Sequence, residues 1–273
     1  MRLGGYVIHG DSRDTLARCL DSLLAVCDEV VAVDSGSTDG SARLVDERGV
    51  RRIVHPWEGF GAARRVAAEA LAHCDYQLFL DSDEWLEPGA AERLRAWKAS
   101  RPDRPLYAVT RRDWADLPTG RFLFSSELQV RIARSDAAKW DPRNLVHEAL
   151  PRRDAVRTGI PIEHRFATDV AAVRAKEERY ALLWALDAHA RGKRPRAPLP
   201  RLLVHAFRFG IVKGAALRGG SPGLELAWVF ARYHARKHEL LAEIARGGHP
   251  EAVAALREGR LRDLYAIVND RSR

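Results

Sequence analysis

An apolar strand followed by a helical segment recurs through the first 110 residues, and this recurrence narrows the fold more than any other property of the chain. The predicted strands are Tyr6–Ile8, Glu29–Asp34, Arg52–His55 and Tyr76–Asp81. Strands that are apolar on both faces and alternate with helices are typical of βαβ units, in which helices cover both faces of a parallel sheet. We therefore predict an α/β fold with a mostly parallel sheet.

The rest of the chain has a different pattern. Residues 106–165 are less regular, with strand-like pieces and loops. From about Thr168 the periodicity is helical. The helices predicted there are 170–191, 199–217 and 223–246. We predict two domains, an α/β domain at 1–168 and a basic, amphipathic helical extension at 169–273.

Composition and length exclude several classes of protein. No apolar stretch approaches the about 18 residues of a spanning helix, and the N-terminus lacks the apolar segment of a signal peptide. The three cysteines show no CxxC spacing, which indicates a reducing cytosol rather than a disulfide framework or a cysteine zinc site. The chain has neither the GxGxxG motif of dinucleotide folds nor a Walker-type phosphate loop.

Two of the predicted strands end in a carboxylate, Asp34 and Asp81. Ligands of open parallel sheets bind beyond the carboxyl ends of the strands, so both side chains are candidates for a binding site. Asp34 opens the loop Asp34–Gly40, whose small residues let a planar ligand approach the backbone. An ordinary capped turn has the same composition and remains the alternative for this loop.

The segment Asp81-Ser82-Asp83-Glu84 places three carboxylates within four residues. Like charges this close repel one another unless a cation lies among them. Oxygen ligands of this kind suit Mg²⁺ or Mn²⁺, which commonly binds one or two carboxylates and substrate phosphates. The alternative is an acid-rich helix N-terminus, because a helix is predicted to begin near Pro88.

Five segments together, in this order and spacing, resemble the inverting family 2 glycosyltransferases with the GT-A fold. The similarity is greatest to the branch of lipopolysaccharide core β-glucosyltransferases, and it covers roughly residues 5–190. The segments are Arg18–Leu23, Val33–Asp39, His55–Gly61, Leu80–Glu84 and Asn144–Glu148. The resemblance implies a Rossmann-like, nucleotide-sugar-binding sheet flanked by helices, with catalysis in residues 1–168.

The resemblance also implies a role for each matching residue on the donor side. Asp34 would contact the base of the nucleotide. Asp81 and Asp83 occupy the DxD motif, in which the first faces the ribose and the second holds a divalent metal on the diphosphate. Arg64 stands where relatives often carry Lys and would pair with a diphosphate oxygen, a geometry that suits a guanidinium.

On the acceptor side, the resemblance points to Glu148 as the catalytic base. An inverting transfer needs one carboxylate to take a proton from the attacking hydroxyl, within about 3 Å of it. A surface acid paired with Arg152 is the alternative for Glu148. His164 falls near a position that supplies a further metal ligand or phosphate contact, and a structural histidine is the alternative there.

The chain departs from the family pattern at two places on the donor side. Relatives usually carry Thr-x-Asn-Glu after the first strand, where this chain has His9–Ser12. After Phe60-Gly61 relatives often have Gln-Lys-Asn, where this chain has Ala63-Arg64-Arg65. Both differences lie on the donor side, so they bear on the identity of the donor rather than on the fold.

The function implied is transfer of a hexose, glucose favoured, from a nucleotide sugar to a saccharide or lipid-linked acceptor in bacterial cell-surface polysaccharide or lipopolysaccharide core biosynthesis. A UDP-sugar is the favoured donor, and Mg²⁺ or Mn²⁺ is the expected cofactor. We expect a cytoplasmic enzyme, peripheral on the inner face of the membrane, that binds no nucleic acid. A haloacid-dehalogenase-like phosphohydrolase is one alternative, although Trp85 stands where that class has Thr or Val. A basic nucleic-acid-binding protein is another, although no helix-turn-helix, zinc-finger or RRM signature is present.

The positive charge is concentrated in the C-terminal third. Residues 190–273 carry 17 Lys and Arg against 7 Asp and Glu, whereas the net charge of the whole chain is +8. Apolar positions flanked by arginines suit an interfacial helix on anionic lipid. They suit equally a helical cap or a homodimer surface, and an arginine-rich solvated face is a further alternative.

Overall fold

The computed structural model describes residues 1–146 and 149–270, which divide into two compact units. Unit 1 consists of residues 1–113, 126–143 and 147–165, and unit 2 of residues 114–125, 144–146 and 166–273. Each unit draws on more than one stretch of the chain. The domain boundary between residues 168 and 169 stays a prediction.

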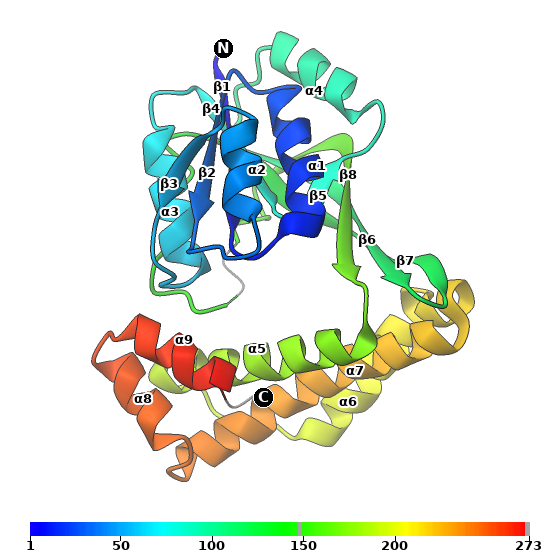
Figure 1. The fold of residues 1–273 in the computed structure, drawn as a ribbon. Coiled ribbons are helices and arrows are strands. Elements are labelled where there is room, and N and C mark those ends of the chain that lie inside the picture. The colour runs from blue at the N-terminus through cyan, green and yellow to red at the C-terminus, as the bar shows by residue number, and fades with distance from the viewer. Residues whose placement is uncertain (147–148, 271–273) are drawn as a thin grey trace. The chain divides into compact units, whose positions relative to one another are not determined.

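The described strands form one eight-stranded sheet in the order β3-β2-β1-β4-β7-β6-β8-β5 (Figure 1). Its first four strands are mutually parallel. These are β3 (Arg51–Val54), β2 (Glu29–Asp34), β1 (Leu3–His9) and β4 (Tyr76–Asp81). They correspond to the four predicted strands, and the α/β class is confirmed.

The other half of the sheet contains long strands that the irregular pattern of residues 106–165 did not reveal. They are β6 (Leu106–Leu117), β7 (Gly120–Arg134) and β8 (Val156–Ala167), with the short β5 (Glu84–Leu86) beside β8. β7 pairs antiparallel with β4, and β5 pairs antiparallel with β8. Buried charged side chains interrupt the apolar alternation of these strands, which is why the sequence pattern is weak there.

Helices cover both faces of the parallel strands in unit 1. Side chains at alternate positions of a strand point to opposite faces. In β4, Leu78 and Leu80 join the layer under α1 (Arg13–Leu24) and α4 (Ala90–Ala99), while Phe79 joins the layer under α3 (Phe60–Ala70). The remaining helix is α2 (Ser41–Glu47), whose buried Val45 packs in the layer of α1.

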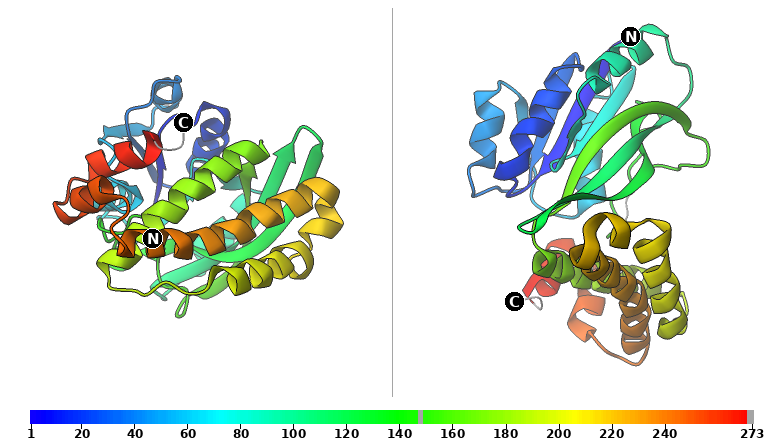
Figure 2. Two further views of the ribbon diagram at one scale, coloured as in Figure 1. Left: turned by 90° about the horizontal axis from the view of Figure 1, so that it is seen from below. Right: turned by 90° about the vertical axis from the view of Figure 1, so that its right-hand side faces the viewer.

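Unit 2 is built mainly of helices around a core of aromatic side chains. Its helices are α5 (Val170–Ala190), α6 (Pro198–Phe207), the π-helix η1 (Arg208–Val212), α7 (Ala215–Ala245), α8 (Pro250–Arg257) and α9 (Leu261–Asp270). α6 runs alongside α7, as both views of Figure 2 show. A predicted break in the helices, at residues 218–222, appears inside α7, where Gly220 has φ 55° and Pro222 follows. No helix in the described part of the chain is long and apolar enough to cross a bilayer.

Candidate active site

The carboxyl ends of the parallel strands bring Asp34 and Asp81 to one edge of the sheet, as predicted. In the register of the sheet, Asp34 lies opposite His9, and Asp81 lies opposite Ile8. Asp34 and Asp81 are therefore the last residues of the two strands on either side of β1. At the usual spacing between strands, their Cα atoms are about 10 Å apart. Ser12 and Ser82, which belong to the loops after β1 and β4, meet through a hydrogen bond of 3.0 Å between their hydroxyls.

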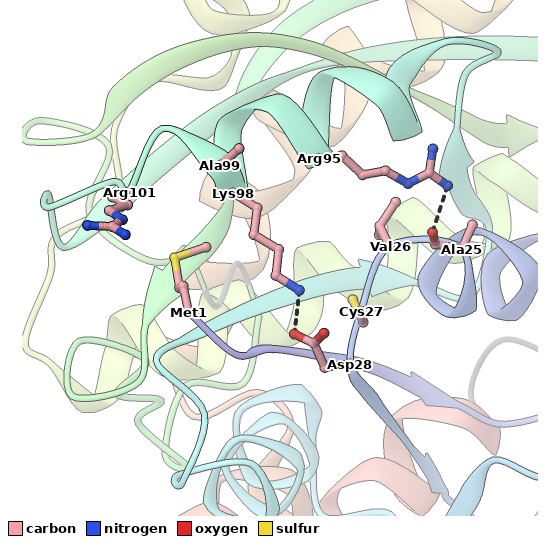
Figure 3. Close-up of a pocket in the computed structure, with 9 residues that line it drawn as sticks. All are labelled: Met1, Ala25, Val26, Cys27, Asp28, Arg95, Lys98, Ala99 and Arg101. Atoms are coloured by element: carbon pink, nitrogen blue, oxygen red, sulfur yellow. Dashed lines mark hydrogen bonds and ion pairs between the residues drawn. The ribbon is translucent and has the colours of Figure 1, made fainter.

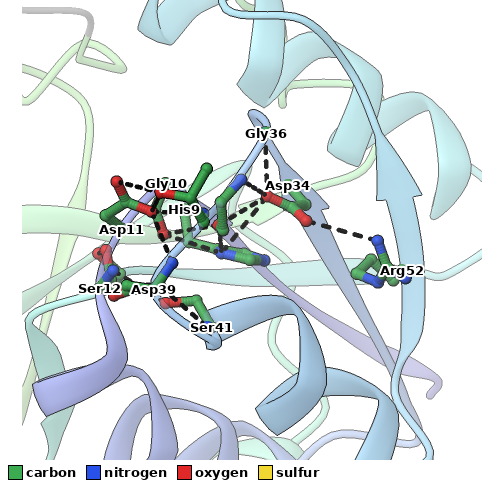
Figure 4. Close-up of polar contacts among 12 residues, drawn as sticks. His9, Gly10, Asp11, Ser12, Asp34, Gly36, Asp39, Ser41 and Arg52 are labelled. Atoms are coloured by element: carbon green, nitrogen blue, oxygen red, sulfur yellow. Dashed lines mark hydrogen bonds and ion pairs between the residues drawn. The ribbon is translucent and has the colours of Figure 1, made fainter.

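Asp34 is buried and organises its own loop (Figure 4). Its Oδ1 accepts hydrogen bonds from the backbone N–H groups of Gly36, at 3.1 Å, and Ser37, at 2.8 Å. The Ser37 hydroxyl donates to the same oxygen at 2.7 Å. Burial works against the charge, yet the hydrogen bonds from Ser37 and the nearby His9 lower the pKa of Asp34 below its usual value. The Arg52 guanidinium lies 3.4 Å from the other carboxylate oxygen, Oδ2.

The loop after β1 interlocks with the loop after β2 (Figure 4). Asp11 Oδ1 accepts the backbone N–H of Thr38 at 2.7 Å, and Asp39 Oδ2 accepts the backbone N–H of Arg13 at 2.9 Å. The segment His9–Ser12, in which this chain differs from the family pattern, therefore helps to hold the loop Asp34–Gly40 in shape through the side chain of Asp11.

Asp81 lies between two arginines. Its Oδ1 accepts from Arg64 of α3 at 2.5 Å, and its Oδ2 accepts from Arg131 of β7 at 2.6 Å. Burial favours the neutral acid, but Arg131 and Arg64 outweigh it and hold the pKa of Asp81 well below its usual range. The Asp81 carboxylate is therefore ionised at neutral pH. Its side chain is 30% exposed, whereas Arg64 is 3% and Arg131 8% exposed, so the carboxylate is the accessible member of the group.

The third acid of the motif, Glu84, is fully buried beneath Asp81. It accepts from Arg131 at 2.5 Å and from Arg111 of β6 at 3.4 Å, and it also receives the backbone N–H of Asp81 at 3.1 Å. The sequence argument required a cation among these crowded carboxylates. In the structure, arginines supply much of that positive charge at Asp81 and Glu84, and whether a metal ion binds as well stays a prediction.

Asp83 and His164 lie together, and a second carboxylate holds the histidine in place. His164 Nε2 is 3.4 Å from Asp83 Oδ2, while its Nδ1 is 2.8 Å from Asp113 Oδ1. Burial lowers the pKa of His164, but Asp83 together with Asp113 outweighs it and raises the pKa to about 9. Arg111 also pairs with Asp113, at 2.8 Å. Asp113 of β6 therefore orients the histidine, whose other ring nitrogen faces the half-buried Asp83.

The Asp83–His164 pair fits a divalent metal. Two ligand atoms bonded to one ion at about 2.1 Å lie no more than about 4.2 Å apart, and the observed 3.4 Å is within that limit. In a metal-binding histidine, the N–H of the other ring nitrogen usually donates a hydrogen bond to a carboxylate, and Asp113 is in the position to accept it. The donor set and its support are thus consistent with the predicted metal ligands Asp83 and His164, whose role stays a prediction.

Gly61 has a steric role next to this group. A Cβ added at Gly61 would lie 2.2 Å from the backbone oxygen of Asp141, so only glycine allows α3 to approach residues 141–142 so closely. α3 carries Arg64, whose guanidinium stacks 5.0 Å from the ring of Trp140. The close approach therefore helps to fix the direction in which Arg64 points.

The structure brings together most of the predicted site residues, although it does not test their roles. Arg64, Asp81, Asp83 and His164 form one connected cluster, and Asp34 lies at the same edge of the sheet. Glu148, the predicted base, lies outside the described residues. The sequence analysis missed three members of the cluster: Arg111, Asp113 and Arg131. Arg131 interrupts the apolar run Val130-Arg131-Ile132, and that interruption was an available signal, whereas Arg111 and Asp113 lie in the polar run Thr110–Asp113.

A separate surface pocket of about 570 Å³ lies at the opposite end of the strands (Figure 3). It is lined by residues around the start of β1 and the end of α1, and by Arg95, Lys98 and Arg101. Lys98 donates a hydrogen bond to the Asp28 carboxylate at 2.5 Å, and Arg95 donates one to the backbone oxygen of Ala25 at 3.0 Å. Because the site carboxylates stand at the carboxyl ends of the strands, this pocket is not part of the cluster.

The sequence model of glycosyl transferase family 2 matches residues 7–154, which is more than half of the chain. A lipopolysaccharide core biosynthesis glycosyltransferase, LpsC of Rhizobium meliloti, is 29% identical over 207 residues, which cover 71% of this chain and 74% of that protein. An uncharacterised glycosyltransferase of Rickettsia felis is 33% identical over 85 residues, covering 31% of this chain and 30% of that protein.

Two solved structures have weaker similarity. Residues 1–349 of S. aureus TarS match with 17% identity and a TM-score of 0.37, over 99% of this chain and 90% of that one. Glucosyl-3-phosphoglycerate synthase of Mycobacterium tuberculosis, solved with Mn²⁺, UDP and glucosyl-3-phosphoglycerate, matches with 21% identity and a TM-score of 0.33, over 41% of this chain and 44% of that one.

Proposed function

The chain belongs to glycosyl transferase family 2, and we propose that it transfers a hexose, glucose favoured, from a nucleotide sugar to a saccharide or lipid-linked acceptor with inversion. The similarity to a lipopolysaccharide core glycosyltransferase supports an acceptor in cell-surface polysaccharide or lipopolysaccharide core biosynthesis. The three cysteines are free thiols, which supports action in a reducing compartment such as the cytoplasm.

One observation carries the proposal, the layering of charge at the strand ends. Asp81 and Asp83 are each 30% exposed, and they pair with less exposed groups: Asp81 with the buried Arg131, which also holds the buried Glu84, and Asp83 with His164, whose side chain is 11% exposed. This arrangement presents carboxylates to a ligand while the cations that orient them are kept from solvent. Such preorganised charge is what a site for a cation-bound diphosphate needs.

On the donor side, we propose that the interlocked loops after β1 and β2 receive the nucleotide. Asp34 keeps the loop Asp34–Gly40 in shape. With Arg52 it forms the side of the donor site that contacts the base of the nucleotide. Asp81 faces the ribose and holds Arg64 near the diphosphate. Asp83 and His164 would hold Mg²⁺ or Mn²⁺, which, when bound, stabilises the negative charge of the leaving diphosphate.

On the acceptor side, we propose that the Glu148 carboxylate takes the proton of the attacking hydroxyl. The hydroxyl oxygen bonds to the anomeric carbon as the bond to the diphosphate oxygen breaks, so inversion follows from a single displacement. This step needs no covalent enzyme intermediate. The competing phosphohydrolase would use Asp81 as a nucleophile, and a carboxylate held on both oxygens by arginine is unsuited to that role.

The test is thermal stabilisation by UDP, GDP and dTDP sugars, each with and without Mn²⁺. We expect a sugar nucleotide, a UDP-sugar first, to raise the melting temperature only when the metal is present. Asp83→Asn should remove this stabilisation, and the matched variant Asp136→Asn, on the exposed surface, should keep it. Stabilisation that is equal in Asp83→Asn and the unaltered chain would refute the metal site.

A second measurement separates the base from the binding residues. Glu148→Gln should keep the metal-dependent stabilisation but lose turnover by about 10²–10⁴-fold, the usual contribution of general acid–base catalysis. Normal turnover in Glu148→Gln would show that another group is the base, whether or not the donor site is correct.

A further inference from the structure

Unit 2 exposes a continuous apolar face along α6 and η1, which we call the α6 face. All of its members are large apolar side chains with more than half of their surface in contact with solvent, between 58% and 68%. They are Leu199, Leu203, Val204, Phe207, Ile211 and Val212. No residue of α6 is buried. Contiguous exposed apolar surface of this kind marks an interaction site.

The α6 face is held in one orientation by the aromatic core of unit 2. Residues 199, 203, 207 and 211 follow a four-residue spacing, which keeps them on one side of the helix. Phe209 points the other way and is buried, with its ring 6.0 Å from Phe124 and 5.4 Å from Phe230. Burial of Phe209 therefore fixes Phe207 and Ile211 outward, although solvent contact is unfavourable for them.

The charge of the segment that carries the α6 face has one sign. Residues 188–224 contain eight Lys and Arg and no Asp or Glu. Arg194, Arg196 and Arg208 are exposed, two of them just before α6 and the third at its end. An apolar strip with basic residues at both ends matches an anionic surface that has an apolar interior.

We propose that the α6 face docks on an anionic lipid bilayer, with the six apolar side chains entering the interface and the arginines contacting the headgroups. A second copy of the chain fits this face less well. In a two-fold symmetric dimer the same patch meets itself, so an acid-free basic segment would face an identical one. Docking on lipid does not depend on the proposed transfer reaction, because neither the donor site nor Glu148 takes part in it.

The experiment is co-sedimentation of the full chain with vesicles of phosphatidylcholine alone or mixed in equal parts with phosphatidylglycerol. We expect binding to the mixed vesicles only, and weaker binding in high salt. Leu203→Asp/Phe207→Asp should lower the partition coefficient by about tenfold or more, because two apolar side chains no longer enter the interface. Leu24→Asp, at an exposed leucine of α1, is the matched control and should bind normally.

Charge is tested separately by Arg194→Ala/Arg196→Ala, which should weaken binding by about fivefold for each charge removed. Melting temperatures close to that of the unaltered chain would show that the variants are folded. Equal binding to both vesicle types, or unchanged binding by Leu203→Asp/Phe207→Asp, would overturn the proposal. So would a dimer in sedimentation velocity that Leu203→Asp/Phe207→Asp converts to a monomer, because the face would then be an interface between copies.

Discussion

The candidate site of unit 1 and the α6 segment of unit 2 use arginine in opposite ways. In unit 1, Arg64 and Arg131 are buried and each is bonded to a carboxylate of the site. In the part of unit 2 around α6, Arg194, Arg196 and Arg208 are exposed, in a segment without acids. A buried arginine has lost its water and needs its partner, whereas an exposed one keeps its water and is available to an external anion.

The difference teaches that net charge is a poor guide to function until burial is known. The acids at the strand ends of unit 1 mark a binding site because buried arginines hold their carboxylates in fixed positions. The bases around α6 mark a surface because they remain in solvent beside exposed apolar groups. Stability measurements can distinguish the two uses of arginine.

The largest expected effect is on Arg131. Arg131→Ala leaves Asp81 and Glu84 without their shared cation, and removal of one partner from a buried ion pair costs about 3–5 kcal/mol of unfolding free energy. Chemical denaturation measures it. Arg143→Ala, at an arginine that is 86% exposed and paired with Asp141, should cost less than about 1 kcal/mol. Similar losses in the two variants would break the comparison.

In unit 2 the matching contrast is between two phenylalanines two positions apart. Phe209→Ala should cost about 3–4 kcal/mol of unfolding free energy, because Phe209 is 8% exposed and packs in the aromatic core. Phe207 is 62% exposed, so Phe207→Ala should cost less than about 0.5 kcal/mol. If Phe207→Ala proved as costly as Phe209→Ala, the α6 face would be packed against protein in solution.

A smaller effect concerns His164 and pH. Its pKa is raised from 6.5 to about 9, so the stability that its charge contributes is complete below about pH 6.5 and is lost as pH rises through 9. Without added metal, we expect the unfolding free energy to fall by on the order of 2–3 kcal/mol over this window. His164→Gln should have a flatter profile between these pH values. Parallel profiles for the two proteins would mean that His164 is not ionised in the folded chain.

The smallest effect is expected for the exposed arginines of unit 2. Arg194→Ala/Arg196→Ala should change the unfolding free energy by less than about 0.5 kcal/mol, since neither side chain is buried. Denaturation in the absence of lipid measures this. A loss above 1 kcal/mol would place these arginines among structural ion pairs, like those of unit 1.

Much of unit 1 was predictable from residues that lie close in the chain. The four parallel strands, the strand-end positions of Asp34 and Asp81, and the helices between them follow from apolar runs and turn-forming residues. The four predicted residues Arg64, Asp81, Asp83 and His164 do lie in one cluster. Their roles, and that of Glu148, stay predictions.

The antiparallel strands and their buried charges were not predictable in the same way. Arg111 and Arg131 break the alternation of β6 and β7, and the sequence pattern alone gives no reason for a buried arginine there. The reason is Glu84 and Asp81, which lie 27 and 50 residues away along the chain. A charge in a strand becomes understandable only when its partner is known.

The order of apolar and polar residues was sufficient to determine the α/β class, the placement of two carboxylates at one sheet edge, and the basic character of the C-terminal third. Periodicity and strand polarity are local properties, so they can be inferred without the fold. Tertiary structure alone decided which arginines neutralise which acids, that Asp113 supports His164, and that Phe207 is exposed while Phe209 is buried. These outcomes depend on burial and on partners distant in the chain, which no local pattern contains.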